Sequence, residues 1–433
     1  MCKGEKILFL TDEEKRMLQG EDGRVRQKCM EFLVKQCEVS GADRLVDVDG
    51  TGDIHTPSTS MVKDYEITLE ELKELADSGA KFKIPTFANK MPMPGCVPMH
   101  GWESCGICRQ EDPQFHDEHL FEEQLTLLKR LGLMATHTCA IYLNSSYWPS
   151  VGQHCSWTES SAVPYCNAVL GGRSNLDGHF ANCFLGKTPY YGLHITENRH
   201  ANVLVKTDRL ISTELEWDVL GFAIGELCGI SVPAITGTAK PNTSIYQRLN
   251  SAMNTGGSIM MYHIPGATPE APTLEYAFGG KKPERTVMID EPVLRKYYDL
   301  INYNPVEDVD FVSLGCPNYN MMDLLRVSQK LEGKKCKIRL WIMTTPWLYD
   351  AAKMQGLLKI FEDAGATLLT GTCPGPMGGV PDGVKTIAMD SAKQSYYISG
   401  MFTDPARPLN VCYGSQDDCI DAALTGKWRG EWR

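Results

Sequence analysis

The sequence predicts an α/β protein built from parallel-rich sheets covered by helices. Two observations carry this prediction: short apolar segments alternate with amphipathic helical segments, and several helices begin with a capping box. The last third shows the alternation most clearly. There we expect strands at 309–314, 338–345, 366–369 and 408–413, and helices at 320–331, at 347–364 and after Ser415-x-x-Asp418.

Capping boxes also start two helices in the first third of the chain. Thr11-x-x-Glu14 predicts a helix that continues to about residue 38, and Thr68-x-x-Glu71 predicts a second one. In both, a hydroxyl and a carboxylate three residues apart satisfy backbone N–H groups that the first turn leaves free.

Further elements are predicted from apolar periodicity. We expect strands at 45–48, 81–85 and 134–138, and helices at 122–132 and 217–227. Together they give three α/β segments, which we place at 1–135, 136–305 and 306–433.

A long segment at 89–118 interrupts the alternation. It is rich in Pro, Gly, Met and Cys and has no clear period. Loops of this length are usually functional or mobile. We therefore expect an excursion from the first segment that reaches the entrance of a binding site.

Composition excludes several classes of protein. The chain has 433 residues, 42% of them hydrophobic, and a formal net charge of −11. Such a composition argues against disorder, and an acidic balance argues against nucleic acid or an anionic membrane as the main partner. We see no transmembrane run and no secretion signal, so we expect a cytoplasmic protein.

Sixteen cysteines are the unusual feature of the composition. In a large chain without a secretion signal they indicate thiols, metals or catalysis rather than a disulfide framework. Cys139, Cys316 and Cys373 each follow a predicted strand, and ligands of open α/β sheets bind beyond the carboxyl ends of strands. Three thiolates meeting there can hold an iron–sulfur cluster with one open iron. The alternative is three buried core thiols, and spacing alone does not decide between the two.

Six sequence words surround these cysteines in a fixed order. They read HTCAIYL at 137–143, WTESSAVPYCNAVLGGRSN at 157–175, GLHITENR at 192–199, SLGCPNYN at 313–320, LLTGTCPGPMGG at 368–379 and MDSAKQSYY at 389–397. Together they resemble the aconitase X family, specifically its large catalytic subunit, from about residue 40 onward. The resemblance implies an aconitase-like fold of several packed three-layer α/β domains that lacks the swivel domain.

The resemblance also implies a cofactor. The HTC, LGC and TC words match cluster ligands at Cys139, Cys316 and Cys373. We expect an iron–sulfur cluster, [4Fe–4S] first, with [2Fe–2S] and [3Fe–4S] left open. An open iron assists the departure of hydroxide when a hydroxy acid loses water.

Substrate contacts are implied at four places. They are Glu159 and Ser160 in the ESS word, Ser391 and Ala392 in the DSAK word, Asn89 and Lys90 after Pro85-Thr86-Phe87-Ala88, and His55 and Thr56 in the first loop. In that first loop the sequence reads DGTGDIHTPST and departs from the family pattern, so His55 and Thr56 are assigned by position alone.

The family's proton-abstracting serine lies on a swivel domain that is either fused or a separate subunit. This chain ends at Arg433 without a segment of that kind. We therefore expect a small swivel-domain subunit as partner and no catalytic base within this chain.

The family dehydrates small hydroxy acids, which leaves the substrate to be chosen. We expect cis-3-hydroxy-L-proline, because no concentrated Arg/Lys pocket for a phosphate is visible in the sequence. The alternatives are (R)-5-phosphomevalonate and another hydroxylated metabolite.

Two further patterns each keep two interpretations. Arg173 either binds a substrate carboxylate or phosphate by a bidentate pair or satisfies loop carbonyls. Cys105-x-x-Cys108 with His116 and His119 is either a zinc site or a packed loop. The zinc interpretation supports a rival of another class, a non-catalytic zinc- or redox-binding protein.

Overall fold

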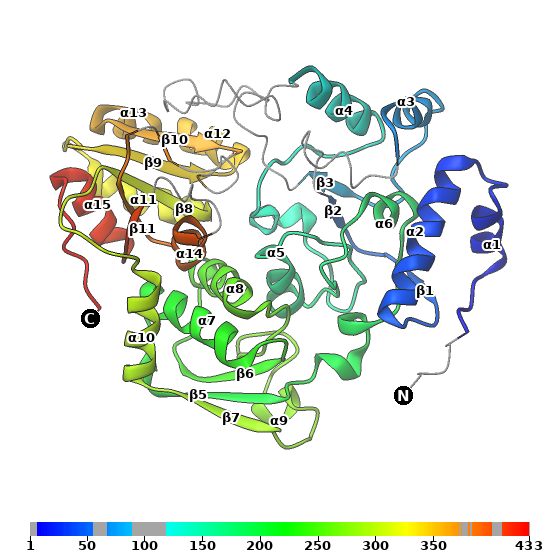
Figure 1. The fold of residues 1–433 in the computed structure, drawn as a ribbon, viewed down its shortest axis with the longest axis horizontal. Coiled ribbons are helices and arrows are strands. Elements are labelled where there is room, and N and C mark those ends of the chain that lie inside the picture. The colour runs from blue at the N-terminus through cyan, green and yellow to red at the C-terminus, as the bar shows by residue number, and fades with distance from the viewer. Residues whose placement is uncertain are drawn as a thin grey trace.

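The protein is described here from a computed structural model. It describes residues 7–54, 67–88, 118–371, 374, 380–381, 383–400 and 409–432. Figure 1 shows the N-terminal helices at one end of the molecule and the C-terminal sheet at the other, with loop-rich chain between them.

Short elements make up the N-terminal part. They are α1 (Asp12–Gln19), α2 (Arg24–Ser40), β1 (Leu45–Asp47), β2 (Gly52–Ile54), α3 (Leu69–Asp77), β3 (Thr86–Ala88) and α4 (Glu118–Arg130). Both predicted capping boxes form, at Thr11 and at Thr68. The single helix expected to residue 38 is wrong, because Gly20 ends α1 in the left-handed conformation with a φ of 82°.

Two strand predictions in this region need correction. The chain at 81–85 forms no strand, and the pairing with β2 begins only at Thr86. The strand expected at 134–138 reduces to one bridge between Met134 and Phe87 of β3. At 81–85 the buried Phe82 and Ile84 alternate with the exposed Lys81 and Lys83, so the segment has the side-chain pattern of a strand without strand pairing.

In the chain from 139 to 200, loops alternate with short helical turns, among them a π-helical turn at Tyr165–Leu170. This segment also contains short 3₁₀ turns, α5 (Ala162–Pro164), α6 (Phe180–Leu185) and β4 (Lys187–Pro189), which pairs antiparallel with β1. This stretch carries several of the residues expected at the site.

A second α/β unit follows. Its elements are β5 (Val203–Ile211), α7 (Glu214–Cys228), β6 (Pro233–Thr238), α8 (Thr243–Gly257), α9 (Leu274–Ala277), β7 (Arg285–Ile289) and α10 (Glu291–Ile301). The three strands are parallel in the order β6-β5-β7, and the predicted helix at 217–227 is α7. Residues of α7, α8 and α10 form the core against this sheet.

The third unit is a parallel sheet in the order β10-β9-β8-β11-β12. Its elements are β8 (Phe311–Tyr319), α11 (Met321–Leu331), β9 (Arg339–Thr344), α12 (Pro346–Met354), α13 (Leu357–Ala364), β10 (Ala366–Thr370), β11 (Thr386–Met389), α14 (Ala392–Gly400), β12 (Asn410–Tyr413) and α15 (Gln416–Thr425). Four predicted strands and the Ser415 capping box form as expected. The long helix expected at 347–364 is wrong, because Gly356 takes a φ of 75° and separates α12 from α13.

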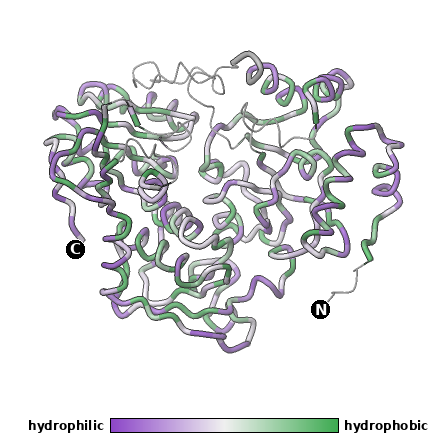
Figure 2. Tube along the Cα trace, in the orientation of Figure 1, coloured by the Kyte–Doolittle hydropathy of each residue, from purple (hydrophilic) through white to green (hydrophobic). Residues whose placement is uncertain are grey.

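This sheet is buried on both faces. Side chains of α11, α13 and α15 pack on one face, and Ile398 of α14 packs on the other. Figure 2 shows hydrophobic residues running along its strands, as a fully covered parallel sheet requires. The predicted α/β class with parallel sheets is confirmed. Among the described residues, no helix combines the length and apolarity needed to cross a bilayer.

Candidate active site

Cys316 lies in an irregular part of β8, near the carboxyl edge of the C-terminal sheet. The pairing of β8 with β9 is regular up to Leu314 and resumes at Tyr319 after a register shift. Gly315 permits this bulge, because it takes a φ of 95° and a side chain there would overlap the carbonyl of Met343. The sequence placed Cys316 after a strand, whereas the structure places it in the bulge of the strand.

Cys139 reaches the same place from a loop. No strand precedes it, and a 3₁₀ turn at Ile141–Leu143 follows it. Its Sγ lies 3.9 Å from Oδ1 of Asn318, two residues beyond Cys316. The neighbouring Thr138 donates a hydrogen bond of 2.7 Å to the same oxygen. Asn318 therefore connects the two cysteine loops.

Without a metal ion, both thiols are in their neutral form. Burial raises the pKa of Cys139 to about 12, with the nearby Glu159 and Cys316 adding to the effect. Burial raises the pKa of Cys316 to about 11, although the Lys393 ammonium and a hydrogen bond with Ser391 oppose the rise. Thiolates at these positions need a further positive charge, such as a metal.

An ion pair stands beside the thiols. Lys393 Nζ lies 3.2 Å from Glu159 Oε1 and 3.1 Å from Ser160 Oγ, and both charged side chains are more than four-fifths buried. Burial disfavours the charged forms of both Lys393 and Glu159. The carboxylate nevertheless raises the pKa of Lys393, and the ammonium and Ser161 lower the pKa of Glu159. Both groups therefore stay charged at neutral pH.

The loop that brings Lys393 to the site is braced from the second unit. The N–H of Ala392 donates to Asp218 Oδ2 at 2.7 Å, at the start of α14. Arg248 Nη2 lies 2.7 Å from Asp390 Oδ2, and the buried guanidinium also donates to the carbonyl oxygen of Asp390. Ser391 caps the helix by accepting from Gln394 N at 3.2 Å. Helices α7 and α8, which carry Asp218 and Arg248, thus fix the DSAK segment.

The structure brings together six of the residues expected at the site. They are Cys139, Cys316, Glu159, Ser160, Ser391 and Ala392. The expected residues His55, Thr56, Asn89, Lys90 and Cys373 lie outside the described residues, as do Cys105, Cys108, His116 and the side chain of His119. Among the described residues, no group of three or more His, Cys, Asp or Glu side chains is arranged to hold a metal ion.

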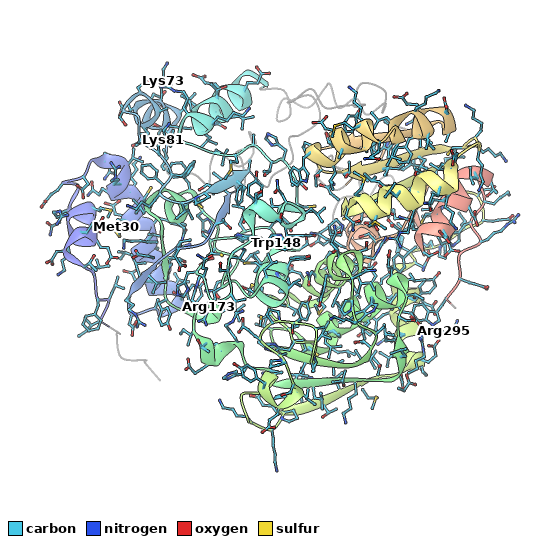
Figure 3. All side chains as sticks on the ribbon, turned by 180° about the vertical axis from the view of Figure 1, so that it is seen from behind. Met30, Lys73, Lys81, Trp148, Arg173 and Arg295 are labelled. Carbon is cyan, nitrogen blue, oxygen red and sulfur yellow. The ribbon has the colours of Figure 1, made fainter. Side chains whose placement is uncertain are left out.

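Arg173 lies in a different environment from the residues around the two thiols. Its Nη1 donates to the carbonyl oxygen of His194 at 2.8 Å, and its backbone forms a bridge with His154. Figure 3 shows Arg173, with Trp148, in the loop-rich region between the N-terminal helices and the C-terminal sheet. The contact with His194 is of the kind expected for an arginine that satisfies loop carbonyls.

Sequence reasoning missed four residues around the site. Lys393 and Asn318 stand inside the quoted words DSAK and LGCPNYN, so the signal was present. Asp218 and Arg248 lie in the interior of two helices and act through distant partners. No local pattern marks such positions.

Comparison with known proteins identifies the family. Models of the aconitase X first, second and third domains match residues 7–197, 201–299 and 309–425. The chain belongs to the aconitase X family. The aconitase X resemblance drawn from the sequence is therefore confirmed.

Relatives within aconitase X include dehydratases of two kinds. The phosphomevalonate dehydratase large subunit of Methanosarcina mazei is 28% identical over 98% of each chain, and that of Methanocaldococcus jannaschii is 30% identical over 90% of this chain and 95% of its own. The cis-3-hydroxy-L-proline dehydratase of Pseudomonas aeruginosa is 28% identical over 95% of this chain and 69% of its own. Dehydratases are hydro-lyases, which confirms the expected enzyme class.

A solved structure supports the fold assignment. The holo-form crystal structure of Thermococcus kodakaraensis aconitase X matches with a TM-score of 0.79 and 28% identity, covering 96% of this chain and 100% of the other. The similarity extends over all three units. The aconitase X architecture therefore describes this chain as a whole.

Proposed function

We propose that this chain is the large subunit of an iron–sulfur hydro-lyase that removes water from a small hydroxy acid. The observation that carries the proposal is the meeting of Cys139 and Cys316 beside the buried Glu159–Lys393 pair. Thiol ligands for iron and a fixed cation for a carboxylate are two of the elements that dehydration of a hydroxy acid needs, the third being a base that removes the proton.

The residues present fit an iron–sulfur cluster. A buried donor near the thiols, Asn318 Nδ2, has no hydrogen-bond partner among the described residues, and sulfur atoms of a cluster accept such bonds. Cys139 and Cys316 would hold the cluster together with Cys373, which follows β10 in the sequence. We propose [4Fe–4S], with [2Fe–2S] and [3Fe–4S] as alternatives. When bound, the cluster supplies an open iron that accepts the leaving hydroxyl.

The chain's own residues bind and orient the substrate. Glu159 holds the Lys393 ammonium in one place, and this cation stabilises a substrate carboxylate as negative charge grows on it during proton removal. Ser160 and Ser391 lie beside Lys393 and Cys316 and offer hydroxyl groups to the same ligand. Asn89, Lys90, His55 and Thr56 remain predicted contacts.

The proton-abstracting base belongs to a partner. Two relatives are named large subunits and are covered over 95–98% of their length, which supports a separate small subunit for this chain as well. We propose that this small subunit is a swivel domain that closes over the site and carries the base.

The substrate we propose first is cis-3-hydroxy-L-proline. Lys393 lies near both thiols and is already paired with Glu159, an arrangement that suits the single carboxylate of a hydroxyproline. (R)-5-phosphomevalonate is the second candidate, because the large subunits that act on phosphomevalonate match this chain over nearly their whole length.

A cytoplasmic location is proposed with the same function. The eleven cysteines that the structure describes are all free thiols. Free thiols and oxygen-sensitive clusters both persist in a reducing compartment.

The test is an anaerobic assay of the chain produced together with its small subunit. Three substrates are compared: cis-3-hydroxy-L-proline, (R)-5-phosphomevalonate and trans-4-hydroxy-L-proline as a control. Dehydration of the first supports our first choice, and dehydration of the second replaces it. Zinc in place of iron in the purified protein would overturn the proposal in favour of a zinc-binding protein.

A further inference from the structure

Asn318 occupies the space between the two cysteine loops. It is 1% exposed, and its Oδ1 accepts a hydrogen bond from Thr138 Oγ1 and lies near Cys139 Sγ. It follows Cys316 by two residues. A single side chain thus contacts the segments of both thiols.

The orientation of the Asn318 amide follows from its neighbours. Thr138 Oγ1 accepts a hydrogen bond of 3.0 Å from Ala140 N, so its own hydrogen is directed to Asn318 Oδ1. Nδ2 therefore carries both N–H groups on the other side of the amide. It has no partner among the described residues, and a buried donor left without a partner destabilises the folded state.

The backbone of Asn318 is fixed as well. Gln247 of α8 donates from Nε2 to Asn318 O at 2.9 Å and accepts from Asn320 Nδ2 at 2.9 Å. Asn320 in turn caps α11. With the main chain held from two sides and Oδ1 held by Thr138, the amide cannot turn to find another partner for Nδ2.

We propose that Asn318 is a positioning residue whose Nδ2 donates hydrogen bonds to sulfur of the iron–sulfur cluster. These bonds stabilise the more negative, reduced cluster and hold the Cys139 loop to the Cys316 loop. The proposal rests on the proposed function, since it requires a cluster at these thiols. Hydrogen bonds to the sulfurs are among the factors that set the potential of such clusters.

The test replaces the donor in two ways. Asn318→Asp keeps the oxygen that Thr138 bonds and substitutes an acceptor for Nδ2, whereas Asn318→Leu removes both groups without adding charge. Asn250→Leu in α8 is the control, because Asn250 is also a fully buried amide but lies outside the site, beside the Tyr262 hydroxyl.

The readouts are taken on the anaerobic two-subunit enzyme. They are iron and sulfide content, the midpoint potential from a titration followed by electron paramagnetic resonance, and cluster loss to a chelator. We expect a lower potential in both variants, lowest in Asn318→Asp, and cluster retention weakened about 10-fold or more. Asn250→Leu should match the wild type.

Each outcome separates this proposal from the one it rests on. A wild-type enzyme without iron and sulfide overturns the proposed function. A wild-type cluster with unchanged potential and retention in both variants overturns the role of Asn318. If neither variant retains a cluster, the melting temperatures of the metal-free proteins decide: equal values support the role, and lower values in the variants show a purely structural one.

Discussion

At the scale of single residues, the buried charges around the start of α14 set the properties of the site. Asp218 is 1% exposed and accepts hydrogen bonds from Ala392 N at 2.7 Å and from the Tyr413 hydroxyl at 2.8 Å. Burial raises its pKa to about 7, against the attraction of Arg248 and with a contribution from Asp390. Near neutral pH this carboxyl therefore exchanges its proton.

Asp218→Asn should alter the dependence of stability on pH. Because the folded pKa of about 7 lies above the usual value of 3.8, the folded state binds the proton more tightly than the unfolded state. The stability that protonated Asp218 contributes to the wild type is therefore lost as pH rises from about 4 through 7, and the variant lacks this contribution to the pH dependence. Urea denaturation at pH 5 and pH 8 gives the free energy of unfolding of both proteins. Relative to that of the wild type, the free energy of unfolding of the variant should be higher at pH 8 than at pH 5. An equal change in the free energy of unfolding of the two proteins between pH 5 and pH 8 would contradict a raised pKa of Asp218.

Glu159→Gln tests the ion pair at the site. The amide keeps the shape but leaves Lys393 without its counter-charge, so the ammonium is no longer fixed for the substrate. We expect kcat/KM to fall roughly 10²-fold with cluster content unchanged. Glu270→Gln is the matched control, since it breaks another largely buried ion pair, between Glu270 of the second α/β unit and Arg199 of the loop-rich stretch before it. An equal fall in both variants would show a general loss of structure.

At the scale of elements, the helix pair α7 and α8 supports the site. The helices approach so closely that a side chain at Gly257 would overlap the carbonyl oxygen of Gly225, and one at Gly225 would lie 2.6 Å from the carbonyl oxygen of Met253. This spacing places Asp218 on α7 and Arg248 on α8 against the start of α14.

Gly257→Ala should therefore separate the two helices. The overlap involves backbone on both sides, so relief requires a helix shift, and overpacking of this kind costs about 1–3 kcal/mol. Chemical denaturation should show this loss. Arg295→Ala on the exposed face of α10 is the control and should change stability by less than about 0.5 kcal/mol. No loss in Gly257→Ala would contradict the close approach of α7 and α8.

Short sequence patterns predicted where helices begin better than where they end. The capping boxes at Thr11, Thr68 and Ser415 were predictable because each is a hydrogen-bond pattern within four residues. Apolar periodicity predicted one long helix at each of two places where the structure has two. Gly20 and Gly356 separate the two helices of each pair, and the periodicity continues across the tight turn.

The site was predictable where motifs mark it. Cys139, Cys316 and Glu159 came from sequence words, and the structure gathers them. Asp218 and Arg248 were not predictable, because their role depends on which helix packs against α14. This packing is a property of the tertiary structure, and no short sequence pattern indicates it.

At the scale of the whole molecule, the site is shared among all three matched domains. Cys139 and Glu159 come from the first, Asp218 and Arg248 from the second, and Cys316 and Lys393 from the third. The proposed cluster, with ligands from the first and third domains, would stabilise the arrangement of these two domains, because anything that binds the folded state alone does so.

The central claim is tested most directly by the iron and acid-labile sulfide content of the anaerobically reconstituted chain. We predict near-equal iron and sulfide in the wild type and in Cys336→Ser, whose half-buried thiol in the C-terminal unit we assign no ligand role. Cys139→Ser, Cys316→Ser and Cys373→Ser should each lose the cluster. Full iron and sulfide in any of these three variants, or none in the wild type, would contradict the account.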